Sequence, residues 1–119
     1  MRKLYAILTV LALVVVVNCT AKAANQSMAD VFPGLNFSGT KATCSLSVYA
    51  EHTTDLIEAT VTLKQGSTTV KQWTNLSANG IMIFSDTANV SHGQSYTLQV
   101  TLSINGASYP VPSVTKTCP

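Results

Sequence analysis

The stretch YTLQVTLSING, from Tyr96 to Gly106, decides the fold class of this chain. Apolar residues alternate with Thr, Gln and Ser as far as Ile104, which is the period of two expected of a β-strand with one buried face. Asn105-Gly106 follows directly and is the dipeptide most typical of two-residue hairpin turns. The stretch therefore predicts a strand that reverses into an antiparallel neighbour.

The same alternation recurs in the preceding part of the chain. Residues 43–51 and residues 57–64 each place apolar side chains on one face and polar side chains on the other. Residues 68–74 are rich in β-branched side chains and follow a Gln-Gly-Ser turn, so we expect a hairpin at this turn. These segments predict strands that each bury a single face.

Residues 81–87 follow an Asn-Gly turn and are apolar on both faces. Ile81 and Ile83 lie on one face, and Met82 and Phe84 lie on the other. We therefore expect both faces of this strand to be partly covered.

Residues 108–117 form the last expected strand. They contain Pro110 and Pro112, which lack the N–H group that a central strand donates. We therefore expect this strand at a sheet edge.

Together these segments predict an all-β protein, an antiparallel β-sandwich of six or seven strands. We divide the chain into a signal peptide (residues 1–23), a leader or edge strand (24–40) and the sandwich domain (41–119). The leader contains Pro33, Gly34 and Gly39, so we expect at most a short edge strand over residues 35–37.

Residues 1–23 have the pattern of a cleaved secretory signal peptide. Arg2 and Lys3 precede an apolar run over residues 4–17, and Ala21-Lys22-Ala23 supplies small residues at the cleavage site. We expect a secreted, extracellular protein that begins at Ala24. Two alternatives are an uncleaved anchor, for which the run is short, and a lipid on Cys19, whose neighbour Asn18 fits a lipoprotein motif poorly.

Removal of the signal changes the charge and the cysteine count. Four lysines then face five acidic residues, and without a basic cluster nothing favours nucleic-acid binding. Cys44 and Cys118 remain as an even pair, and a disulfide between them is the expectation for an exported chain. A metal site and free thiols are the alternatives.

The segment Val90-Ser91-His92-Gly93-Gln94-Ser95-Tyr96 resembles the tyrosine corner of immunoglobulin-like and fibronectin type III-like domains. The resemblance implies that Tyr96 bonds back to the backbone of a corner containing Gly93, and that Trp73 is a core residue. The chain departs from antibody domains because the residue two positions after Tyr96 is Leu98 and not a cysteine. The chain is also similar to small uncharacterised secreted proteins of bacteria, which implies no activity.

We find no arrangement of residues that predicts catalysis. His52 and His92 are isolated in turn-like segments, and the serines lie in no known nucleophile motif. One loop is flanked by three carboxylates, those of Glu51, Asp55 and Glu58. They are either ligands of a calcium ion or, on the simpler interpretation, solvated surface charges. We therefore expect no enzyme activity, no cofactor and no metal.

The remaining hypothesis is a monomeric extracellular module that binds a protein or carbohydrate or has a structural role. Its rigid loops would be residues 51–56, 74–79 and 88–95. The candidate binding residues are Tyr49, Glu51, His52, Asp55, Asn75 and His92, where Tyr49 is either exposed or packed on neighbouring threonines.

Two alternatives to this hypothesis stay open. In one, residues 24–40 add as a strand to a neighbour in a surface assembly. In the other, the protein is a small inhibitor or hydrolase with an unrecognised site. Asn-x-Ser sequons occur at Asn25, Asn36, Asn75 and Asn89, and they are glycan acceptors only in a eukaryotic host.

Overall fold

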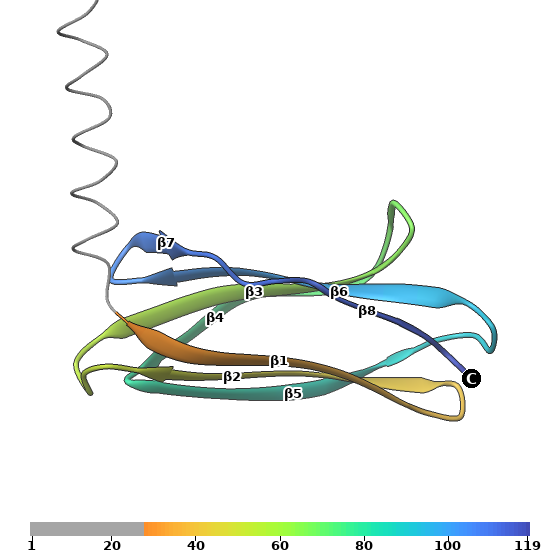
Figure 1. The fold of residues 1–119 in the computed structure, drawn as a ribbon, viewed down its shortest axis with the longest axis horizontal. Coiled ribbons are helices and arrows are strands. Elements are labelled where there is room, and N and C mark those ends of the chain that lie inside the picture. The colour runs from red at the N-terminus through yellow and green to blue at the C-terminus, as the bar shows by residue number, and fades with distance from the viewer. Residues whose placement is uncertain (1–27) are drawn as a thin grey trace, which may run out of the picture.

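The computed structural model describes residues 28–119, which form two antiparallel sheets packed face to face (Figure 1). Sheet A has the strand order β1-β2-β5, and sheet B has the order β4-β3-β6, with β7 and β8 both paired to β6. The strands are β1 (Ala29–Ser38), β2 (Lys41–Ala50), β3 (Leu56–Gln65), β4 (Thr68–Asn79), β5 (Ile81–Asn89), β6 (Ser95–Ile104), β7 (Ala107–Tyr109) and β8 (Val114–Thr117). The predicted all-β sandwich is confirmed, whereas the signal peptide and Cys19 lie outside the described residues.

Strand β1 corrects the expectation of a leader with only a short strand. All ten of its residues pair with β2, so the sandwich begins at Ala29 rather than at residue 41. Pro33 is tolerated because β1 is the edge strand of sheet A, where a missing N–H breaks no ladder. Gly34 lies opposite Ser45, whose hydroxyl occupies the space that a Cβ at position 34 would need.

The core lies between the two sheets and comes from the predicted inward faces. Leu46 and Val48 of β2 belong to the same buried cluster as Val61 and Leu63 of β3 and Leu98 of β6. All five side chains have no exposed surface. Burial of each such side chain contributes about 1.5–3 kcal/mol, so the cluster supplies much of the drive to fold.

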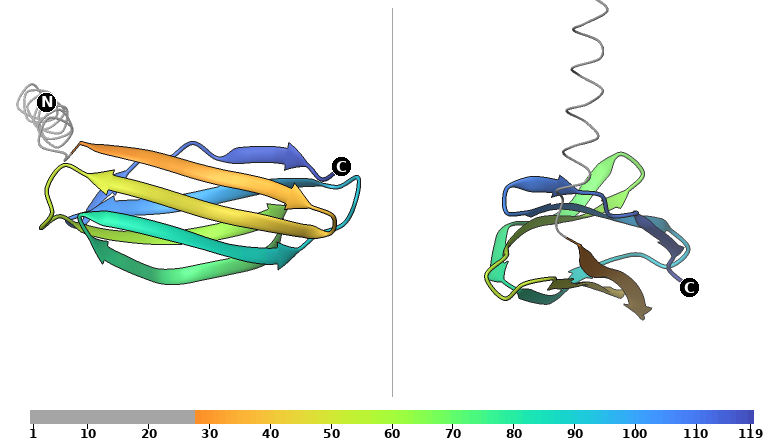
Figure 2. Two further views of the ribbon diagram at one scale, coloured as in Figure 1. Left: turned by 90° about the horizontal axis from the view of Figure 1, so that it is seen from below. Right: turned by 60° about the vertical axis from the view of Figure 1, so that its left-hand side comes forward.

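The chain passes from sheet B to sheet A at Gly80, between β4 and β5 (Figure 2). Gly80 has a φ of 77°, and a Cβ there would lie 2.9 Å from the backbone of Thr53. The Gly80 amide donates to the Asp55 carbonyl at 2.9 Å, and its carbonyl accepts from the Ala50 amide at 2.8 Å. Only glycine fits this corner without displacing the neighbouring loop.

The expected loop over residues 74–79 is instead the second half of β4, which continues to Asn79. The ladder with β3 is irregular between Ala59 and Val61, and Asn75 in this part of β4 has a φ of 59°. A β-bulge of this kind absorbs one extra residue and lets the strand continue. The sequon at Asn75 therefore lies on a strand, whereas that at Asn89 ends β5.

Trp73 closes one long side of the sandwich, where the edge strands β4 and β5 lie over each other. Its ring meets Phe84 edge to face at 5.4 Å between centroids, and its Nε1 donates to Asp86 Oδ2 at 2.7 Å. The ring is only half-buried, so Trp73 lies at the margin of the core rather than at its centre. The opposite side is closed by the Tyr109 hydroxyl, which donates to the Ala29 carbonyl at 2.9 Å.

The corner before β6 has the geometry that its resemblance implied. The Tyr96 hydroxyl accepts a hydrogen bond from the Ser91 amide at 2.8 Å, and the ring is 2% exposed. Gly93 turns the chain with a φ of 79°. The corner therefore holds the loop over residues 90–94 against the core.

The last expected strand divides into β7 and β8 because Pro110 and Pro112 interrupt the ladder. Both short strands pair only with β6, so the predicted edge position is confirmed.

Candidate functional site

The outer face of sheet A is the most unusual surface of the described residues. Four large apolar side chains are exposed there: Phe32 by 59%, Tyr49 by 42%, Ile81 by 56% and Ile83 by 65%. The register places Tyr49 beside Ile81, and Ser47 between Phe32 and Ile83. We call these four residues the apolar face, which lies on the strands turned toward the viewer in the left panel of Figure 2.

The apolar face follows from the alternation of the strands. Val48 and Met82 point inward and are buried, so their neighbours Tyr49, Ile81 and Ile83 point outward. The expected partial cover over Ile81 and Ile83 is therefore absent from the described part of the chain. Alternation identifies an outward face, but nothing in it says whether another element covers that face.

Tyr49 is exposed. The sequence left two possibilities for it, exposure or packing on neighbouring threonines, and the structure shows the first. Its ring lies against Phe32 with centroids 6.2 Å apart and planes at 66°, an edge-to-face pair. The pair joins β1 and β2 on the solvent side and fixes both rings without burying them. A rigid aromatic pair of this kind gives contact area to a partner at little cost in side-chain entropy.

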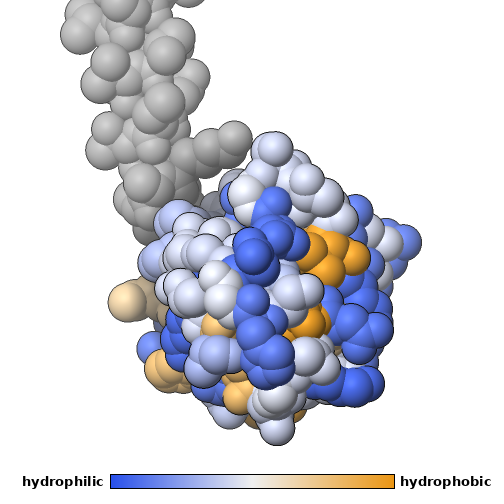
Figure 3. Space-filling model, turned by 90° about the vertical axis from the view of Figure 1, so that its right-hand side faces the viewer, coloured by the Kyte–Doolittle hydropathy of each residue, from blue (hydrophilic) through white to orange (hydrophobic). Residues whose placement is uncertain are grey.

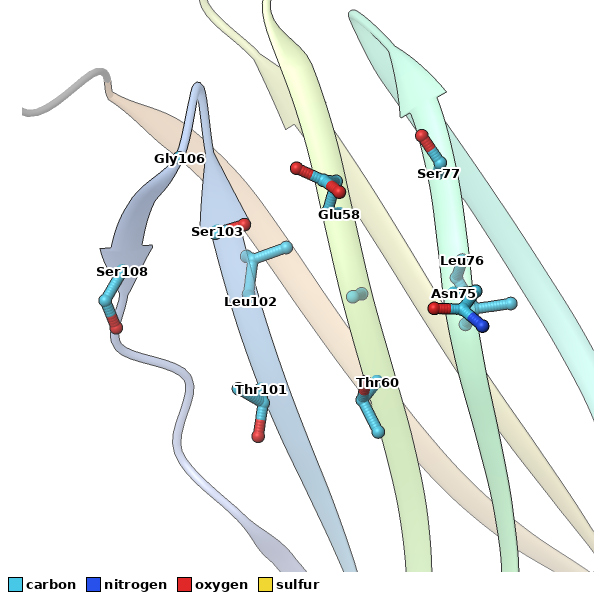
Figure 4. Close-up of a pocket in the computed structure, with 11 residues that line it drawn as sticks. Glu58, Thr60, Asn75, Leu76, Ser77, Thr101, Leu102, Ser103, Gly106 and Ser108 are labelled. Atoms are coloured by element: carbon cyan, nitrogen blue, oxygen red, sulfur yellow. The ribbon is translucent and has the colours of Figure 1, made fainter.

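The outer face of sheet B has the opposite character. A shallow groove of about 520 Å³ crosses β4, β3, β6 and β7 (Figure 4). Its only charged residue is Glu58, and hydroxyl and amide groups make up most of its polar lining: Thr60, Asn75, Ser77, Thr101, Ser103 and Ser108. Such groups already bond to water, so each hydrogen bond to a ligand adds only about 1 kcal/mol net.

The predicted loop residues do not converge on one site. His52 lies beyond the end of β2, whereas His92 lies in the loop before β6, at the other end of the sandwich. His92 Nδ1 is 2.7 Å from the Pro119 carbonyl oxygen. The two histidines therefore share no common site.

Asp55 has a structural role. Its carboxylate accepts from the His52 amide at 3.0 Å and from Asn105 Nδ2 at 2.9 Å. Two hydrogen bonds lower the pKa of Asp55. The larger effect comes from Asn105 and the next from the His52 amide. Within residues 28–119 no group of three metal-binding side chains comes together, so Glu51, Asp55 and Glu58 form no calcium site there.

The expected disulfide is not formed, because Cys44 and Cys118 are both free thiols. Cys44 lies within β2, opposite Leu35 and Asp86, where burial, with a smaller contribution from Asp86, raises its pKa to about 11. Cys118 follows β8, and its Sγ lies 3.4 Å from the Gly39 carbonyl oxygen. Each sulfur is fully buried in the core.

Comparison with protein-family models and with curated proteins finds no match to this chain. Across the described residues there is no helix of the length and apolarity needed to cross a membrane. Of the residues that form the apolar face, sequence reasoning identified only Tyr49 as a candidate, and missed Phe32, Ile81 and Ile83.

Proposed function

We propose that this protein is a secreted, non-enzymatic binding module that recognises a protein partner through the apolar face of sheet A. The proposal rests on one observation, the exposure of Phe32, Tyr49, Ile81 and Ile83 together on the outer face of sheet A. Small soluble domains seldom leave contiguous large apolar side chains in water without an interaction role. Burial of each such side chain by a partner would contribute about 1.5–3 kcal/mol.

Two further features support a protein rather than a carbohydrate partner. Aromatic residues are enriched in the centres of protein interfaces, and the Phe32–Tyr49 pair is already fixed in orientation. The hydroxyl-lined groove of sheet B offers only the weaker net gain of polar contacts. We place the domain among immunoglobulin-like or fibronectin type III-like sandwiches, a relationship that the tyrosine corner at Tyr96 supports.

The alternative of strand addition is less well supported. Residues 29–38 already form β1, with Leu35 fully buried, so these residues would have to leave β2 before adding to a neighbour. Pro33 also lies on this edge strand, and proline at an edge opposes further pairing. The hydrolase or inhibitor alternative gains no support from the two histidines, because His52 and His92 lie at opposite ends of the sandwich.

A site-specific photo-crosslinker tests the proposal. We would place it at Ile83 on the apolar face and, as a matched control, at Thr101 on the outer face of sheet B. Both residues are exposed and lie within a strand, Ile83 in β5 and Thr101 in β6. In the medium of its own host, crosslinked products are expected from position 83 and not from 101, and they should disappear when Phe32→Ser is added. Equal yields from both positions would contradict the proposal.

A further inference from the structure

Apart from Asp86, which lies beside Lys71, the acidic and basic residues of the described chain are separated along the strand direction. Within residues 28–119, Asp30, Glu51, Asp55 and Glu58 all lie at the end where β2 ends and β3 begins. We call this the acidic end, and the same part of the chain places no lysine there. Met28 and Leu56, which are 75% and 37% exposed, add apolar surface to it.

All four lysines of the described residues lie at the opposite end, which we call the basic end. Lys41 begins β2 beside Asn89, Lys64 of β3 pairs with Thr97, and Lys116 of β8 pairs with Tyr96. Lys71 is partly neutralised, since its Nζ is 3.7 Å from Asp86 Oδ2. Figure 3 looks onto this end, whose surface is mainly hydrophilic with small apolar areas.

The basic end also contains a hollow. A cavity of about 300 Å³ lies between the edges of the two sheets and is lined by Lys41, Val70, Lys71, Thr87, Ala88 and Asn89. Two lysines line it, Lys41 and Lys71, and the Lys71 Nζ already donates to the Thr87 carbonyl at 3.0 Å and lies 3.7 Å from Asp86 Oδ2. The hollow therefore suits a carboxylate side chain supplied from outside.

We propose that the protein self-associates head to tail, with the acidic end of one copy docked on the basic end of the next. The occupant is a second copy because the two ends of this chain are complementary in charge, and Glu51 lies in an exposed loop at the acidic end. Such a contact is heterologous and does not close on itself, so it generates linear chains of subunits. Asp30 pairs with Tyr49, so the acidic end borders the apolar face on the outer side of sheet A.

Strands of ten residues separate the two ends by about 30 Å. At an ionic strength of about 10 mM the Debye length is also about 30 Å, whereas it is about 8 Å at physiological salt. The contact should therefore depend strongly on salt. We expect the association constant to fall by about tenfold or more between 10 mM and 150 mM salt.

Sedimentation velocity on the chain from Ala24 onward, which contains every described strand, tests the proposal. Three proteins with charge reversals are compared with the parent. The acidic-end variant carries Asp30→Lys, Glu51→Lys and Glu58→Lys, and the basic-end variant carries Lys41→Glu, Lys64→Glu and Lys116→Glu. The exchange variant carries all six substitutions and keeps the net charge of the parent.

The parent should form salt-sensitive oligomers, each single-end variant should remain monomeric, and the exchange variant should regain the association of the parent. Recovery in the exchange variant separates complementary ends from an effect of net charge or of misfolding. Monomeric behaviour of the parent at low salt would overturn the proposal, as would oligomers that persist in both single-end variants. A monomeric parent that binds anionic phospholipid vesicles would also overturn it, because the basic end would then serve a membrane surface.

Discussion

The outer faces of the two sheets arise from the same alternation of residues but differ in chemistry. On sheet A the outward positions near one end are Phe32, Tyr49, Ile81 and Ile83, and on sheet B they are mainly threonine and serine. The inner faces, by contrast, are both apolar and together form one buried cluster. The inner faces therefore determine the fold, and the difference between the outer faces is where a function can be sought.

The largest expected effect concerns the two thiols, which lie on the inner side of the two sheets. In the native protein we expect both thiols to react with a disulfide reagent about a thousandfold more slowly than in denaturant, because modification requires opening of the core. Cys118 should react before Cys44, since it follows the short strand β8 near the chain terminus, and burial raises the pKa of Cys44 to about 11. A denatured, unreduced chain from Ala24 should titrate two thiols. A count of zero free thiols would contradict this prediction and show that Cys44 and Cys118 form a disulfide.

The second prediction compares the inner and outer faces of sheet A directly. Leu46→Ala removes a fully buried side chain and should lower the free energy of unfolding by about 2–5 kcal/mol. Ile83→Ser on the outer face should change it by no more than about 1 kcal/mol. Urea denaturation measures both. If Ile83→Ser were as destabilising as Leu46→Ala, the apolar face would be part of the core and not a free surface.

The third prediction concerns the corner of sheet B. Tyr96→Phe keeps the buried ring and removes the hydroxyl that accepts the hydrogen bond of the Ser91 amide. The expected loss is about 1 kcal/mol, seen as a lower melting temperature, with faster amide exchange in residues 90–94. Tyr49→Phe is the matched control, because its hydroxyl lies on the exposed face of sheet A. Equal losses in both variants would show that the corner bond adds nothing specific.

The smallest expected effect is the pH dependence of the loop that joins the two sheets. Hydrogen bonds from Asn105 and from the His52 amide lower the pKa of Asp55, so its carboxylate stabilises the folded state at neutral pH. This contribution is lost as the pH falls from the ordinary carboxyl range through the lowered pKa. Asp55→Asn should therefore flatten the fall in melting temperature below about pH 4, whereas Glu51→Gln should not. An unchanged slope in Asp55→Asn would contradict the assigned role.

The sequence predicts the central strands because their alternation is regular, and it predicts the Asn105-Gly106 turn because both residues adopt positive φ. It does not predict the length of β1, since Pro33 and Gly34 are tolerated only on an edge strand paired to a long neighbour. It also misses the continuation of β4 through Asn75, because a bulge depends on pairing with β3.

The candidate site was harder to predict for a different physical reason. Periodicity shows that Ile81 and Ile83 share a face, but exposure depends on whether another strand lies over that face. In this fold the strands of sheet B lie over the inner side only. Phe32 was missed because its strand was itself unexpected. Charge separation between the ends likewise becomes visible only once the register is known.

Carbene footprinting tests the central claim most directly, by labelling the purified protein and the protein in the medium of its own host. The proposed function predicts that Phe32, Tyr49 and Ile83 are strongly labelled in the purified protein and protected in the host medium. Residues that line the groove of sheet B, such as Thr101, should be labelled equally in both. Unchanged labelling of the apolar face together with protection of the groove would contradict the claim and assign recognition to sheet B.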